Sequence, residues 1–179
     1  MLIVLVVEHG PYRYLSKSEI SFEIYQALAY GCSAVSYFTY WTPEYEDVWH
    51  FRNGMISEEG ERCRHYYDVA EVNAETRRIG EIVAGTMSKA VFHVGEEKEN
   101  VAAFTGYDGI DAITGGRFTA GFFEGDLMLI ANKDFDRDAE ALVKAERALA
   151  VLNKETGAWE KSDGRITVSK GSGEMVRFL

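Results

Sequence analysis

The chain has 179 residues, enough for a hydrophobic core in one or two small domains. It carries 19 Lys and Arg against 29 Asp and Glu, which gives a formal net charge of −10. Such an acidic chain is not expected to bind nucleic acid or an anionic membrane surface, because phosphate groups are bound by clustered Lys and Arg. The opening apolar run is too short to span a membrane and no positive charge precedes it, so we expect no transmembrane segment, no signal peptide and a cytoplasmic location by default.

The first predicted elements are a strand and a helix. The strand, Leu2–Val7, is a continuous apolar run, which is typical of a parallel strand buried on both faces, and Glu8 closes it. The helix is predicted to begin at a Ser-x-x-Glu capping box formed by Ser16 and Glu19, and to end at Gly31 in a left-handed conformation. Between these caps apolar residues recur at helical spacing, so one face of the helix can lie against a sheet.

A second strand is predicted from about Cys32 to Tyr40, and a second helix from about Glu61 to Val83. A strand, a crossover helix and another buried strand favour parallel pairing. In parallel sheets ligands bind beyond the carboxyl ends of the strands, where Glu8, Tyr40 and Trp41 all fall.

From Met87 onward the pattern changes to short alternating strands separated by Gly-rich turns. Strands are predicted at Ala90–Val94, Val101–Thr105, Phe118–Phe123, Leu127–Ala131, Arg165–Ser169 and Met175–Leu179. Residues 138–152 are ambiguous, because their composition favours a helix whereas apolar and polar residues alternate with period two. We favour strands here, since the flanking Asn-Lys-Asp and Lys-Glu-Thr-Gly segments are typical of hairpin turns.

Several of these segments resemble retaining glycoside hydrolases of the β-galactosidase-like branch, in the region from strand seven through strand eight of the catalytic barrel. The resemblance rests on Tyr12-Arg13 with the capping box, on Gln26–Gly31 and on Tyr37–Pro43. Asn53–Ile56, Glu59-Gly60, Tyr66-Tyr67 and Val72–Glu75 are similar to the following loop and last helix. The resemblance implies a partial (β/α)8-barrel segment at 1–86 and an antiparallel β-sandwich-like domain at 87–179. The expected fold class is therefore α/β plus all-β.

Such a barrel has eight strands in about 250 residues, whereas this chain has room for two strand-helix units. The carboxylate that the resemblance places on strand four as acid/base falls outside this chain. Glu8 matches the position of the nucleophile, which must be ionised and held below the anomeric carbon with the acid about 5 Å away. The alternative is that Glu8 is a solvated acid, or one paired with Arg13 in the next loop.

The predicted substrate-binding residues are Arg13, Tyr40, Trp41 and Trp49. An indole at a strand end can stack on the apolar face of a pyranose ring, although large aromatic residues also pack in ordinary cores. Trp49 is a weaker candidate than Trp41, as are His50 and Phe51 beside it, because such a loop can simply cover the domain.

The remaining signals indicate no cofactor and no metal site, since the histidines lack the close spacing of metal ligands, and Cys32 and Cys63 are expected to be reduced thiols. The function that the resemblance implies is hydrolysis of glycosidic bonds, with this chain forming the C-terminal portion of such an enzyme and carbohydrate as its ligand. The alternative is a non-catalytic module that binds carbohydrate or completes the barrel of a partner. Self-association is also expected, because open parallel edges recruit further strands.

Overall fold

The computed structural model describes residues 1–44, 47–96 and 100–179. It has mixed α/β content: among the described residues there are two helices, and the sheets are mostly antiparallel. No helix in these ranges is both long and apolar enough to cross a membrane.

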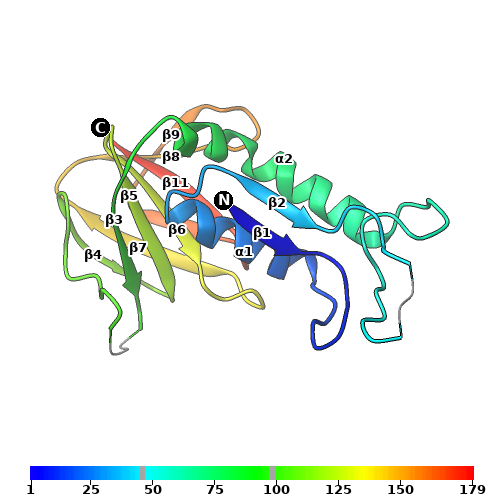
Figure 1. Ribbon diagram of the computed structural model, residues 1–179. Coiled ribbons are helices and arrows are strands. Elements are labelled where there is room, and N and C mark those ends of the chain that lie inside the picture. The colour runs from blue at the N-terminus through cyan, green and yellow to red at the C-terminus, as the bar shows by residue number, and fades with distance from the viewer. Residues whose placement is uncertain (45–46, 97–99) are drawn as a thin grey trace.

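The first part of the chain has the predicted order of strand, helix, strand and helix (Figure 1). These elements are β1 (Leu2–Leu5), α1 (Lys17–Ala29), β2 (Val35–Phe38) and α2 (Arg64–Ala84). β1 and β2 pair in parallel, with Leu2 opposite Val35. Both strands are shorter than predicted, and in the described chain they form a sheet of two strands only.

The second part consists of antiparallel strands. They are β3 (Ser88–Val94), β4 (Ile110–Thr114), β5 (Phe118–Phe123), β6 (Leu127–Asn132), β7 (Ala139–Ala145), β8 (Leu149–Leu152), β9 (Trp159–Ser162), β10 (Arg165–Val168) and β11 (Gly173–Phe178). The order in one sheet is β3-β5-β6-β11-β8-β9, and in the other it is β10-β7-β4.

The six-stranded sheet is the middle layer of the molecule, and its alternate residues enter two different cores. Phe123, Leu129 and Met175 face a core that they share with β1 and both helices. Phe122 and Met128 face a second core, to which the three-stranded sheet contributes. Because both of its faces are covered, every residue of β5 and β6 is buried.

Helix α1 connects these layers. It contacts β1 on one side and β5 and β6 on the other, and it packs against α2 (Figure 1). Ile20, Ile24 and Leu28, at the predicted helical spacing, are buried in the shared core. Gly121 in β5 permits this approach, because a Cβ atom there would lie 1.9 Å from the carbonyl oxygen of Ala29.

The structure confirms some strand predictions and contradicts others. Residues 138–152 contain the two predicted strands, β7 and β8, which lie in different sheets, so period two outweighs helix propensity there. The strand predicted at Val101–Thr105 is wrong, since this segment makes only an isolated bridge between His93 and Ala103. Positive φ angles at Gly106, Asp108 and Gly109 then turn the chain into β4, which the sequence analysis did not predict, nor did it predict β9.

The capping box of α1 is present as predicted. The Ser16 hydroxyl accepts from the Glu19 amide, and the Glu19 carboxylate accepts from the Ser16 amide at 2.8 Å. The same carboxylate pairs with Arg13. The bond to Arg13, followed by the bonds to Ser16, lowers the pKa of Glu19 to about 2.

Glu19→Gln is therefore expected to destabilise the protein by about 1 kcal/mol near neutral pH. Because the folded pKa of Glu19 is lowered, its contribution is complete above about pH 5 and disappears as the pH falls towards 2. Urea unfolding of the parent and variant at pH 7, 4 and 2.5 measures this difference. Glu81→Gln is the control, because the Arg77–Glu81 pair is exposed and should contribute no more than about 0.5 kcal/mol. If the difference in unfolding free energy between the parent and Glu19→Gln does not change with pH, the prediction is contradicted.

Candidate functional site

Glu8 lies beyond β1, and its carboxylate is held by donors from two separate segments. Oε1 accepts from the Tyr14 backbone N–H at 3.2 Å, and Oε2 accepts from Asn53 Nδ2 at 2.6 Å. Arg52 Nε lies 3.9 Å from Oε2. The side chain of Glu8 is 19 % exposed, so these donors hold a carboxylate that still reaches solvent. None of these partners is a second carboxyl group.

The segment that carries Asn53 is fixed to both strand ends. Glu8 and Arg52 exchange two backbone hydrogen bonds of 2.9 Å. Thr42, beyond β2, accepts from the Gly54 amide through Oγ1 at 3.0 Å and donates to the Ile56 carbonyl at 2.7 Å. A Cβ atom at position 54 would lie 2.7 Å from Thr42 Oγ1, so only glycine fits this approach. Asn53 itself has a φ of 56°, which turns its side chain back to Glu8.

Aromatic rings surround the strand ends. His9 contacts the rings of Tyr12, Phe38, Trp49 and Phe51, with centroid separations between 4.9 and 6.1 Å. Tyr40, Trp41 and Trp49 remain 56 %, 50 % and 45 % exposed. Since about half of each of these side chains is accessible, the rings are available to a ligand as well as packed on the protein.

The pairing of Arg13 with Glu8 that was considered above is wrong. The Arg13 guanidinium pairs with Glu19 and donates to the Tyr14 carbonyl at 2.9 Å, while Glu8 takes its donors from Tyr14, Asn53 and Arg52. The hydrogen bond to Glu19 raises the pKa of Arg13. Arg13 therefore stabilises the start of α1.

Comparison of this chain with models of known protein families, with curated proteins and with solved structures finds no match.

Three contributors to this site were not predicted from the sequence: the Tyr14 amide, the Asn53 side chain and His65. Asn53 was noted only as part of the resemblance, although an Asn-Gly pair is a signal for a turn with positive φ. His65 was regarded as an isolated histidine. Its side chain is 1 % exposed, and both of its ring nitrogens lie within hydrogen-bonding distance of carbonyl oxygens.

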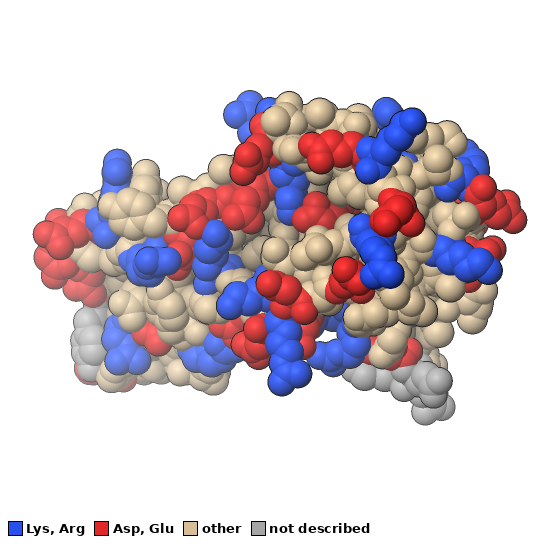
Figure 2. Space-filling model, turned by 180° about the vertical axis from the view of Figure 1, so that it is seen from behind, with Lys and Arg blue, Asp and Glu red and all other residues tan. Residues whose placement is uncertain are grey.

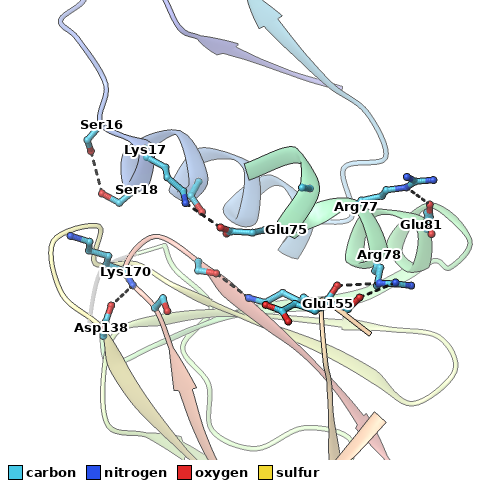
Figure 3. A pocket seen from close by; sticks show the side chains of 15 residues that line it. Ser16, Lys17, Ser18, Glu75, Arg77, Arg78, Glu81, Asp138, Glu155 and Lys170 are labelled. Carbon is cyan, nitrogen blue, oxygen red and sulfur yellow. Dashed lines mark hydrogen bonds and ion pairs between the residues drawn. The ribbon is translucent and has the colours of Figure 1, made fainter. Parts of the chain in front are cut away.

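A separate groove with a volume of about 1200 Å³ lies between the helices and the turns of the antiparallel sheets (Figure 3). Lys17 and Glu75 approach each other from α1 and α2 across one wall, while Arg78 donates to the Lys154 and Glu155 carbonyls at 3.1 and 3.0 Å. None of the predicted site residues lines it. The groove therefore belongs to the junction between the helices and the sheets.

The charged side chains form no large surface of one sign on the face shown in Figure 2, where Lys and Arg are interspersed with Asp and Glu. Within residues 1–44, 47–96 and 100–179, no group of His, Cys, Asp and Glu has the arrangement of a metal site. The groups that the structure places at the Glu8 carboxylate are the Tyr14 amide, the Asn53 side chain and the Arg52 guanidinium.

Proposed function

We propose that this chain binds carbohydrate at an aromatic rim formed by the exposed Tyr40, Trp41 and Trp49, and supplies Glu8 as one carboxylate of a glycoside hydrolase site. The observation that carries the proposal is a carboxylate beyond a parallel strand, held by Tyr14 and Asn53, with His9 next to it in sequence packed against the exposed Trp49. Aromatic faces suit the apolar side of a sugar ring, and a fixed carboxylate suits the anomeric centre. The sequence resemblance supports the same interpretation.

In this proposal residues 1–86 are the closing segment of a (β/α)8 barrel, followed by a β-sandwich-like domain. The parallel β1-α1-β2 unit and the two antiparallel sheets with a common core support that division. A retaining hydrolase needs a second carboxyl group about 5 Å from the first. Because no carboxyl group contacts Glu8 in the described chain, a partner polypeptide would supply the acid/base.

Trp41→Ala is expected to weaken saccharide binding by about 1–3 kcal/mol, the contribution of stacking on an aromatic ring. The measurement is tryptophan fluorescence during titration with methyl glycosides of common hexoses at millimolar concentration. The titration is performed in a Trp159→Phe background, because Trp159 lies in β9 and would add its own fluorescence. The remaining emission then comes from Trp41 and Trp49 alone.

Two outcomes decide between the candidate functions. Binding that is weakened by Trp41→Ala, without turnover of aryl glycosides by the pure chain, supports a carbohydrate-binding part of a divided site. Robust turnover that is abolished by Glu8→Gln would show instead that the chain is catalytically complete. An absence of any saccharide response, or an equal response in Trp41→Ala, would contradict the carbohydrate proposal.

The partner in this proposal pairs with the two-stranded sheet, and a second copy of the chain can occupy the same place. Ile3 in β1 and Phe38 in β2 are 54 % and 40 % exposed, although parallel sheets are ordinarily covered on both faces. We therefore expect concentration-dependent self-association in sedimentation velocity experiments. Ile3→Lys should restore the monomer, because a charge on an open strand opposes pairing.

Leu142→Lys is the matched control for this experiment, since Leu142 is an exposed apolar residue of β7, away from the parallel sheet. It should leave the association unchanged. A monomer at high concentration that binds no dye specific for apolar surface would contradict the prediction.

A further inference from the structure

We infer that His65 is a positioning residue that holds the Glu8 carboxylate by fixing both segments that donate to it. Its importance for catalysis rests on the proposed function, whereas the contacts themselves do not. His65 lies in the first turn of α2 and is 1 % exposed. It makes no direct contact with Glu8, so it would act through other residues.

The two ring nitrogens of His65 reach the two segments separately. Nδ1 lies 2.7 Å from the carbonyl oxygen of Asn53, whose side chain donates to Glu8 Oε2. Nε2 lies 2.9 Å from the carbonyl oxygen of Leu15, the residue after Tyr14. The imidazole also stacks on the Tyr14 ring, with centroids 4.1 Å apart and an interplanar angle of 11°. One buried ring thus fixes the backbone on both sides of the carboxylate.

Both partners are carbonyl oxygens, which only accept hydrogen bonds. A neutral imidazole carries one N–H, whereas an imidazolium carries two. Both bonds can therefore form together only when the ring is protonated. When His65 loses a proton, one carbonyl is left facing a ring nitrogen without hydrogen, and the corresponding segment is released.

Charged and titratable groups from the loop after β1 and from the start of α2 act on the Tyr14 side of this stack. They act on the Tyr14 ring and comprise the carboxylates of Asp68 and Glu8, the guanidinium of Arg64 and the thiol of Cys63. Asp68 is 3 % exposed and accepts from Arg64 Nε at 2.9 Å. Arg64 therefore neutralises Asp68, and the Glu8 carboxylate remains as the acid that His65 affects through Asn53 and Tyr14.

The test is an NMR titration of the full chain labelled with ¹⁵N, without ligand, between about pH 5 and pH 8, where histidine changes its charge. At low pH both ring nitrogens of His65 should carry hydrogen, and one N–H signal should be lost as the pH rises. In the same step the Asn53 side-chain amide or the Tyr14 backbone amide should shift, because these groups donate to Glu8. The parent protein provides this result without any variant.

His65→Gln should abolish the pH-dependent shift of both amides. His9→Gln is the matched control, because His9 lies beside Glu8 in the aromatic cluster but makes neither of the two carbonyl contacts. It should leave the shift intact. If His65→Gln does not fold, the titration of the parent still decides the question.

A His65 that titrates while the Asn53 and Tyr14 amides stay still would overturn the inference and leave His65 a purely structural residue. A ring with a single N–H throughout the titration would overturn it too. Because no saccharide is present, failure of the carbohydrate proposal leaves this result unaffected. Where saccharide does bind, its affinity should fall in the same pH step in the parent and not in His65→Gln.

Discussion

Gly121→Ala is expected to destabilise the protein by about 3 kcal/mol or more, the upper range for overpacking a core. The added Cβ would lie 1.9 Å from the carbonyl oxygen of Ala29 and 2.8 Å from its carbon. These are backbone atoms of the last turn of α1, so no side-chain rotation relieves the overlap. Helix α1 would have to move away from β5 and open the shared core. Thermal unfolding should show a midpoint lower by about 6–12 °C.

Gly80→Ala is the control for this experiment. Gly80 lies in the interior of α2, and a Cβ atom there would meet nothing within 4 Å. The same chemical change should therefore stabilise the protein by about 0.5–1 kcal/mol through helix propensity. If the two variants have equal stability, the close contact between α1 and β5 does not determine the packing.

Lys154→Met is expected to destabilise the protein by about 3 kcal/mol at pH 7, because it leaves a largely buried carboxylate without its cation. Lys154 Nζ lies 2.7 Å from Glu174 Oε1 and donates to the Ser172 hydroxyl and the Gly173 carbonyl. The two charged side chains are only 20 % and 14 % exposed. Solvent therefore compensates only in part for the lost ammonium group.

The destabilisation caused by Lys154→Met should depend on pH, because it arises from the charge on Glu174. Burial raises the pKa of Glu174, and Lys154 opposes that rise. Without Lys154 the folded pKa should rise further above the unfolded value, so stability is gained as the pH falls and Glu174 becomes protonated. The deficit relative to the parent should thus shrink between pH 7 and about pH 4 in urea unfolding. Lys154→Met with Glu174→Met should recover most of the loss, and a deficit independent of pH would refute the assignment.

Local signals were sufficient to predict much of the fold. The capping box and the stop at Gly31 gave α1 nearly to the residue, because each feature satisfies backbone groups of the helix itself. The alternation in 138–152 predicted β7 and β8, because successive side chains of a strand point to opposite faces of its sheet. The strand predicted at Val101–Thr105 failed because nothing in its apolar pattern indicates that it meets β3 at one bridge only.

The site was predictable only in part. Glu8 and the exposed rings of Tyr40 and Trp41 follow from their places at strand ends. The role of His65 does not follow, because its two partners lie 12 and 50 residues away in the sequence. Such contacts become visible only when α2, the loop after β1 and the segment around Asn53 are brought together.

The position of α1 has a consequence for how the molecule opens. Ile24 of α1 and Leu129 of β6 belong to the same core, together with Val4 of β1. Separating α1 from the sheet would expose apolar surface on three elements at once, so partial opening at this place loses much of the stabilisation of the core that α1 shares with β1 and β6. Amide hydrogens in α1 and β6 should therefore exchange with solvent through one shared event, and the two parts of the chain behave as a single cooperative unit.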